Sequence, residues 1–266
     1  MAKAAGPVNV SSDTTSKETQ TLRADAAAIA RATGVLSRGG LAAFPTETVY
    51  GLGERADDPR AIAALYAAKG RPSFNPLIAH VRDLDAARRL GTFSDAAVSL
   101  AKMFWPGALT IVVKAAKDCA VSELARAGLD TVAIRMPAHE VAQALLAAAD
   151  FPIVAPSANR SGHVSPTTAQ HVADDLGGRI DLILDGGACS GGIESAIVDY
   201  SGTVPRLLRS GGIARGEIEK ITGPLASANR SEVSAPGMMA SHYAPKTRLR
   251  LGAEAVDQGE ALLAFG

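Results

Sequence analysis

The feature that most constrains the fold of this chain is an alternation of short apolar runs with segments of helical periodicity. Residues 41–44 and 77–81 have the length and composition of buried strands, whereas Ile62, Leu65 and Lys69 recur at the spacing of one helix face. About ten such elements alternate over roughly 180 residues, as in sheets whose strands are joined by helices. The sequence therefore predicts the α/β class, with one domain built on a twisted mixed sheet flanked by helices.

Changes in composition divide the chain into four parts. Residues 1–21 are rich in Ala, Ser, Thr and Lys and are expected to form a disordered tail. Residues 22–220 hold the alternating elements. Residues 221–247 turn to Gly, Pro, Ser, Ala and Asn, a composition typical of an extended linker. Residues 248–266 end in an apolar run, which we interpret as the opening strand of a truncated second domain.

Charge and composition exclude several classes of protein. The 27 basic residues balance 27 acidic ones, so a globally basic nucleic-acid-binding surface is not expected. Cys119 and Cys189 are far apart and lack CxxC spacing, which favours reduced structural thiols. No apolar run reaches the ~18 residues of a membrane span, and the N-terminus lacks a secretory signal. We therefore expect a cytoplasmic protein with no membrane partner.

A stiff, positively charged loop spans residues 69–76. Lys69 and Arg71 flank Gly70, and Pro72 and Pro76 restrict the backbone at two points. The planar guanidinium of Arg71 suits a bidentate phosphate contact, and the ammonium group of Lys69 would act as a compact positive charge. The alternative is a pair of solvated surface charges. Asn-Pro at the end of the loop is more often a turn than a ligand.

Other polar residues follow further apolar runs. Ser157 and Asn159 come after the strand predicted at residues 152–155, Thr46 and Thr48 lie in a hydroxyl- and glycine-rich loop over residues 46–53, and Arg209 ends another strand. We expect the segments around residues 69–80 and 155–162 to face each other across one ligand. Ser157 has no GxSxG motif around it, so nucleophilic hydrolysis is weakly supported.

Arg135 lies in the alternating apolar strand predicted over residues 131–136. A cation in such a strand needs a partner, either a carboxylate of the protein or that of a substrate. His80, taken alone, is more often a structural histidine than a ligand. The histidines show no HExxH or HxxxH pair, so no protein-held metal site is predicted.

These residues together describe a cleft of Lys, Arg, Ser, Thr and Asn. Such a cleft suits a phosphorylated ligand that also carries a carboxylate. The glycine-rich turn over residues 186–192 matches neither GxxxxGK[ST] nor GxGxxG, which excludes the P-loop and Rossmann interpretations.

The same residues, as an ordered set over about residues 22–220, resemble the YrdC-domain family of L-threonylcarbamoyladenylate synthases. The motifs that carry the resemblance are Phe44-Pro45-Thr46-Glu47-Thr48-Val49-Tyr50-Gly51-Leu52-Gly53, Lys69-x-Arg71-Pro72 with Asn75-Pro76-Leu77, Trp105-Pro106-Gly107 with Leu109-Thr110, Arg135-Met136-Pro137, Ser157-x-Asn159, Ser165-Pro166-Thr167, Glu194-Ser195, and Leu208-Arg209-x-Gly211. Residues 234–238 and 242–246 resemble the linker of the family's long form, which carries a C-terminal domain.

The resemblance implies a YrdC-like catalytic domain over residues 22–220. Its reaction would convert L-threonine, bicarbonate and ATP, with Mg²⁺ bound to the ATP, into threonylcarbamoyl-AMP and pyrophosphate. Lys69 and Arg71 would be catalytic. ATP would contact Lys69, Arg71, Asn75, Thr131, Ser157, Asn159, Ser165, Arg209 and Tyr243. L-Threonine would contact Thr46, Thr48, His80, Arg135, Ala155 and Ser195.

The resemblance also implies partners. A separate transferase would move the threonylcarbamoyl group to a tRNA adenosine next to the anticodon, and a weak direct tRNA contact is compatible with this role. Two other functions are less well supported by the sequence. An RNA-binding module on the same fold is disfavoured by the zero net charge and the few aromatic residues. A related carbamoyl-transfer enzyme is disfavoured because such chains are larger and carry zinc-binding cysteine clusters.

Overall fold

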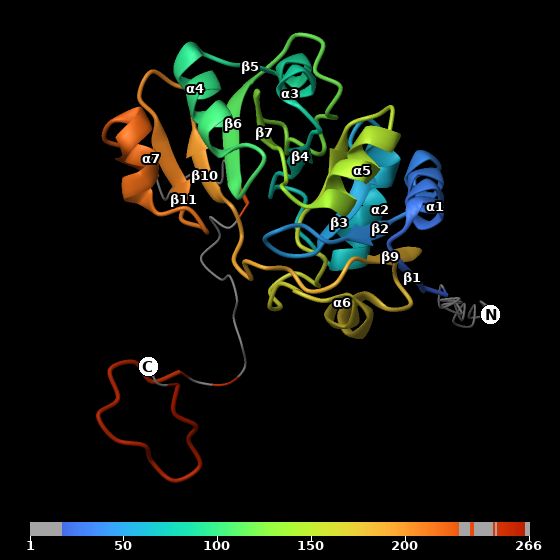
Figure 1. Ribbon diagram of the computed structural model, residues 1–266, viewed down its shortest axis with the longest axis vertical. Helices are drawn as coiled ribbons and strands as arrows, with labels where there is room; N and C mark the ends of the chain where they lie inside the picture. The colour runs from blue at the N-terminus through green and yellow to red at the C-terminus, as the bar shows by residue number, and fades with distance from the viewer. Residues whose placement is uncertain (1–17, 229–234, 237–246, 248, 264–266) are drawn as a thin grey trace, which may run out of the picture.

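The computed structural model describes residues 18–228, 235–236, 247 and 249–263. Its main body is a mixed sheet with helices packed around it (Figure 1). The strands are β1 (Gln20–Arg23), β2 (Ala42–Phe44), β3 (Gly51–Arg55), β4 (Ile78–His80), β5 (Gly91–Thr92), β6 (Leu109–Ala115), β7 (Thr131–Arg135), β8 (Ile153–Val154), β9 (Leu182–Asp185), β10 (Ala196–Asp199), β11 (Arg206–Arg209) and β12 (Ala226–Ser227).

The helices are short, and most begin at a side chain that caps a free backbone N–H. Asp58, for example, accepts a hydrogen bond from Arg60 N at the start of α2, directly before Pro59. The helices are α1 (Ala26–Ser37), α2 (Pro59–Lys69), α3 (Leu84–Leu90), α4 (Asp95–Phe104), α5 (Glu140–Ala148), α6 (Ala169–Leu176) and α7 (Arg215–Thr222). α1 packs against α5, and α4 packs against α7 (Figure 1).

The strand order is β1-β9-β2-β3-β8-β4-β7-β6-β10-β11-β12, and β5 pairs with β6. Parallel pairs such as β4 with β7 alternate with antiparallel pairs such as β6 with β7, which confirms the predicted mixed sheet. β4 and β7 run side by side in the register that places His80 opposite Arg135. Two residues distant in the sequence therefore end neighbouring strands at the same edge.

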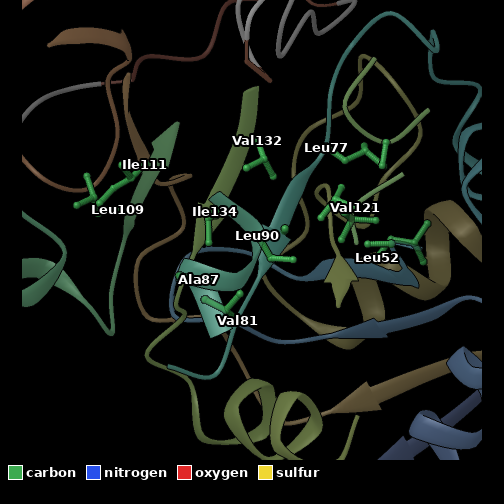
Figure 2. Close-up of a cluster of buried hydrophobic side chains, with 14 of the residues drawn as sticks. Leu52, Leu77, Val81, Ala87, Leu90, Leu109, Ile111, Val121, Val132 and Ile134 are labelled. Atoms are coloured by element: carbon green, nitrogen blue, oxygen red, sulfur yellow. The ribbon is translucent and has the colours of Figure 1, made fainter. Parts of the chain in front are cut away.

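The main hydrophobic core lies between the sheet and its covering helices. Leu52 of β3, Leu109 of β6, Ile134 of β7 and Leu77, directly before β4, are buried in it (Figure 2). A second core cluster joins α1 and α5 to β2 and β9. Because both faces of the sheet are covered, its central strands are nearly continuous apolar runs.

Three predicted boundaries differ from the structure. Gln20 and Thr21, assigned to the disordered tail, pair with β9 in β1. Residues 51–53, assigned to a loop, belong to β3, because the backbone of these glycine-containing residues pairs with β2, and the rest of β3 pairs with β8. The linker expected from residue 221 starts later, because α7 continues to Thr222 and Leu225 is buried.

Most of the apolar run at residues 262–266, the predicted opening strand, lies outside the described residues, and residues 262–263 form no strand. Residues 249–263 are exposed and contain neither helix nor strand; Figure 1 shows them apart from the sheet. Their side chains are therefore not buried in a core, and their backbone is not paired with a neighbouring strand. Within the described ranges, every helix is too short or too polar to cross a bilayer.

Candidate active site

One cavity opens where β4, β7, β8 and β11 end, beside the C-terminus of α2. Most of the predicted site residues line this cavity, and they come from widely separated parts of the chain. They are Thr48, Lys69, Arg71, Asn75, His80, Arg135, Ala155, Ser157, Asn159, Ser195 and Arg209. Arg71, Ser157 and Arg209, which come from three separate segments of the chain, therefore share one site.

Lys69 ends α2 and is 3% exposed. The following Gly70 takes a left-handed conformation at φ 58°, which turns the chain sharply and is readily available to glycine. Lys69 Nζ donates hydrogen bonds to the backbone carbonyls of Ser157 and Asn159. Burial, aided by Arg71 and opposed by Asp175, holds the pKa of Lys69 well below its usual value. The amine of Lys69 thus joins the loop over residues 69–76 to the segment over residues 155–162.

Arg71 turns back over its own loop. Its guanidinium donates to the carbonyls of Asn75, at 3.3 and 3.4 Å, and of Pro76, at 3.0 Å. Burial lowers its pKa to about 10, with Tyr66 acting in the opposite direction. The side chain therefore remains a cation at neutral pH.

Arg209, at the end of β11, faces Ser195. It donates to the Ser195 carbonyl at 2.9 and 3.1 Å and to the Ser195 hydroxyl at 3.2 Å. That hydroxyl also lies 2.7 Å from the hydroxyl of the buried Thr110. Burial lowers the pKa of Arg209 to about 10; the charge of Glu194 opposes this decrease, and the charges of Arg135 and Arg71 add to it. The cations of this cavity are thus close enough to repel one another.

The partners of these cations are informative. Among the described residues, no salt bridge joins Lys69, Arg71 or Arg209 to a carboxylate; their hydrogen bonds go mainly to main-chain carbonyls. Carbonyl oxygens satisfy the donors without cancelling the charge. A cavity with three largely buried, uncancelled cations has a strong electrostatic preference for an anion.

Arg135 differs because its partner is a carboxylate of the protein. Its Nη2 lies 2.5 Å from Glu47 Oε1, and Nη1 donates to Thr48 Oγ1 at 2.9 Å. Glu47 also accepts from Ala138 N at 3.0 Å. Of the two partners considered for Arg135, the structure contains the protein carboxylate. The pairing orients the guanidinium, which still lines the cavity.

Thr46 supports Thr48 and does not itself line the cavity. Its hydroxyl lies 2.8 Å from that of Thr48, donates to Val49 O and accepts from two backbone N–H groups. The glycine-rich turn packs on the same segment, since Gly191 N and Gly192 N donate to the carbonyls of Glu47 and Thr48. These contacts leave Thr48, rather than Thr46, facing a ligand.

His80 is neutral at physiological pH. Burial, aided by the charge of Arg135, lowers its pKa to about 3. Its Nδ1 lies 3.1 Å from the Ile78 carbonyl, so this nitrogen carries the hydrogen and Nε2 is an acceptor. An acceptor next to a guanidinium suits a ligand that presents both a donor and a carboxylate.

The two ends of the Asn159 side-chain amide differ in their hydrogen bonding. Its Nδ2 donates at 2.8 Å to the carbonyls of Arg160 and His163 and so shapes the loop. Its Oδ1 is buried without a hydrogen-bond partner in the described structure. An unsatisfied buried acceptor in a ligand cavity is expected to meet a ligand or a water molecule.

Three other predicted residues lie outside the cavity lining or outside the described residues. Thr131 opens β7, four residues before Arg135, and is half-buried beyond the cavity. Ser165 is buried and donates to Glu194 Oε1 rather than lining the cavity. Tyr243 lies outside the described residues. The binding roles of these three stay predictions.

Sequence reasoning missed several residues that organise the site. Glu47 and Glu194 were present in the quoted motifs but received no role, although carboxylates next to Thr48 and Ser195 could have suggested one. Thr110 gave no such signal, because a threonine in an apolar strand is common. Pro236 lines the cavity, and its carbonyl lies 3.4 Å from Arg209 Nη1.

Comparison with known proteins agrees with this geometry. Residues 34–211 match the family model of Sua5, YciO and YrdC proteins, described as "Telomere recombination". The chain belongs to the Sua5/YciO/YrdC family. Residues 213–263 match a second model, the C-terminal domain of threonylcarbamoyl-AMP synthase.

Relatives of this Sua5/YciO/YrdC chain include two curated proteins named threonylcarbamoyl-AMP synthase. The one from Bacillus subtilis is 47% identical over 230 residues, and the one from Pyrococcus abyssi is 45% identical over 225 residues. These alignments cover 84% and 82% of this chain, and 66% of each relative. The chain thus spans just under two thirds of their length.

A solved structure of P. abyssi Sua5 complexed with L-threonine is also similar. Its TM-score is 0.80 at 44% sequence identity, with 86% of this chain and 68% of that chain covered. That structure therefore shares the fold described above.

Gly211 of this Sua5/YciO/YrdC chain is expected to tolerate no side chain. A Cβ there would lie 2.2 Å from Ala196 N and 2.4 Å from Glu194 O, both backbone atoms that cannot rotate away. We expect Gly211→Ala to lower the free energy of unfolding by about 3 kcal/mol, as overpacking of a close contact does. Urea unfolding measures this directly.

Gly212→Ala is the matched control, because the nearest atom to its Cβ would be 3.6 Å away. Equal stabilities of the two alanine variants would show that the close approach of residue 211 to the Ser195 segment is not required.

Proposed function

We propose that this chain synthesises L-threonylcarbamoyl-AMP from L-threonine, bicarbonate and ATP, releasing pyrophosphate. The observation that carries the proposal is the set of cations Lys69, Arg71 and Arg209, which converge in one cavity with carbonyl rather than carboxylate partners. The family membership and the names of the relatives support the same activity.

The nucleotide would occupy the side of the cavity that carries most of the charge. Lys69, Arg71 and Arg209 would contact the triphosphate, and Ser157 and the free Oδ1 of Asn159 would contact polar groups of the nucleotide. Asn75 lies beside Arg71 in the same lining. Thr131, Ser165 and Tyr243 complete the proposed ATP set.

The amino acid would lie between Arg135, Thr48 and Ser195. The Arg135 guanidinium, oriented by Glu47, would bind the carboxylate of L-threonine. Neutral His80 would accept a hydrogen bond at Nε2, and Ala155 would contribute its backbone. Thr46 would act through Thr48, to which it is hydrogen-bonded.

The chemistry needs alignment more than covalent help. The neutral threonine amine adds to carbon dioxide and loses a proton, or reacts with bicarbonate and releases water, giving a carbamate. A carbamate oxygen then forms a bond to the α-phosphorus as the bond to the bridging oxygen breaks, and pyrophosphate leaves. Buried cations would stabilise the charge on the phosphates during this step. Mg²⁺ bound with ATP would supply further charge neutralisation.

The expected result is pyrophosphate release that requires threonine and bicarbonate together. The purified protein should release pyrophosphate from ATP at a low rate when either substrate is omitted, because the carbamate is the attacking group. Serine, which lacks the methyl group, serves as the matched amino acid control. Release at the same rate with and without threonine would refute the proposal.

The product would be passed to other proteins. Threonylcarbamoyl-AMP is a mixed anhydride of a carbamate and a phosphate, so an acyl-accepting enzyme must consume it. We propose a cytoplasmic tRNA threonylcarbamoyl transferase as that enzyme, with at most a weak direct contact between this chain and tRNA. The balance of 27 basic and 27 acidic residues is consistent with weak RNA binding.

A further inference from the structure

Glu194 has no role in the steps above, yet it occupies a distinctive position. Of the described residues that line the cavity, it alone carries a carboxylate. Its exposed fraction is 9%, so the charge is largely removed from bulk water. Among described residues its carboxylate receives one hydrogen bond, from Ser165 Oγ to Oε1 at 2.5 Å.

The backbone around Glu194 is held firmly. Gly212 N donates to the Glu194 carbonyl at 3.2 Å, and Gly211 packs directly against the same segment. Arg209, the neighbouring cation, is bonded to the adjacent Ser195 and not to Glu194 itself. The position of the carboxylate is therefore defined without a salt bridge that would cancel its charge.

The cations of the cavity, Arg209 among them, favour the Glu194 carboxylate until a polyanion binds beside it. The phosphates of ATP carry several negative charges, and Glu194 would repel them at short range. The repulsion disappears if a divalent cation lies between the carboxylate and the phosphates. Oxygen donors such as carboxylates and hydroxyls are the ligands that Mg²⁺ accepts, usually together with substrate phosphates and water.

We propose that Glu194 supplies the protein's carboxylate to the divalent cation that accompanies ATP, with Ser165 orienting that carboxylate. The inference depends on the proposed use of ATP. Glu194 lies on the nucleotide side of the cavity because its charge acts on Arg209, whereas Glu47 already pairs with the Arg135 guanidinium on the amino-acid side. The ammonium group of threonine is the competing cation, and the test separates the two.

The test is calorimetric titration of ATP, without turnover, in excess Mg²⁺ and again in EDTA. For Glu194→Gln we expect about 10-fold weaker ATP binding in Mg²⁺, because a cation ligand is lost. In EDTA we expect binding equal to or tighter than wild type, because a repulsive charge is gone. This opposite response to the same substitution distinguishes a cation ligand from a residue that merely shapes the cavity.

Two further variants keep the test decisive. The exposed Glu123→Gln makes the same charge change outside the cavity and should behave as wild type in both buffers. Glu194→Asp keeps the charge with a shorter side chain and should retain wild-type ATP affinity in EDTA but lose part of the gain in affinity from Mg²⁺.

Electron paramagnetic resonance of Mn²⁺ with ATP should show a changed spectrum on binding to wild type and a smaller change with Glu194→Gln.

Each of the other outcomes would contradict either the role proposed for Glu194 or the proposed function. If Glu194→Gln weakens ATP binding equally in Mg²⁺ and EDTA, or leaves the response to Mg²⁺ unchanged, Glu194 does not serve the cation. If it weakens threonine binding while the Mg²⁺ response is intact, the carboxylate faces the ammonium group. If wild type binds no ATP in either buffer, the proposed function itself fails.

Discussion

Replacing Lys69 with Met is expected to reduce threonine-dependent pyrophosphate release at least ~100-fold, the size of effect seen when a preorganised donor is removed from a site of charge development. Methionine fills a similar volume but has neither charge nor N–H groups. The substitution would remove one of the cations of the cavity. It would also leave the carbonyls of Ser157 and Asn159 without the amine that joins them to α2.

The measurement is steady-state pyrophosphate release, accompanied by urea unfolding to establish that the variant is folded. Arg60→Met is the matched control, because Arg60 is an exposed cation at the opposite end of the same helix. It should retain wild-type activity. Activity of Lys69→Met within threefold of wild type would remove Lys69 from the site.

Replacing Glu54 with Gln is expected to stabilise the protein in alkaline solution. Glu54 lies on β3 with 0% exposure, and its Oε2 is buried without a hydrogen-bond partner in the described structure. Burial, together with the charges of Asp58 and Asp181, raises its pKa from 4.5 to about 8. Glutamine keeps the shape and can still accept from Arg55 N, as Glu54 Oε1 does at 2.7 Å.

The direction follows from proton binding in the two states. Between pH 4.5 and about 8 the folded protein retains a proton on Glu54 that the unfolded chain has lost. The free energy of unfolding therefore falls as the pH rises through this window, and the loss is complete above it. Each unit of pKa difference corresponds to about 1.4 kcal/mol, so the rise from 4.5 to about 8 predicts an advantage for Glu54→Gln of about 5 kcal/mol at pH 9.

Urea unfolding at a series of pH values would test this expectation. The difference between Glu54→Gln and wild type should be small near pH 4 and should grow towards pH 9. Glu123→Gln, at an exposed carboxylate, should show no such trend. A constant difference across the pH range would mean that Glu54 does not keep its proton in the folded protein.

Local patterns were sufficient for many elements of the fold. The helix ending at Lys69 was visible in its apolar spacing and in the Asp58-Pro59 start, because helix caps and periodicity depend on neighbouring residues. β3 was missed because its glycines signal a loop, whereas the strand exists through pairing with β2 and β8. Strand pairing depends on distant residues and leaves little trace in a local window.

The candidate site shows the same division. The need of Arg135 for a partner followed from its apolar strand, but nothing local could select Glu47, which lies 88 positions away. Similarly, Thr131 and Arg135 are both in β7, yet only Arg135 reaches the cavity. A strand extends about 3.3 Å per residue, so four residues separate two positions by roughly 13 Å.

By itself, the sequence determined the α/β class, the segments that carry the cations, and the family resemblance, because composition, periodicity and motif order are properties of the linear chain. The tertiary structure alone decided that Lys69, Arg71 and Arg209 share a cavity with main-chain carbonyls as partners. It also decided that Glu47 neutralises Arg135 and that Glu194 remains without a salt bridge among the described residues. Charge interactions depend on distance and burial, and both are set by how the strands pair.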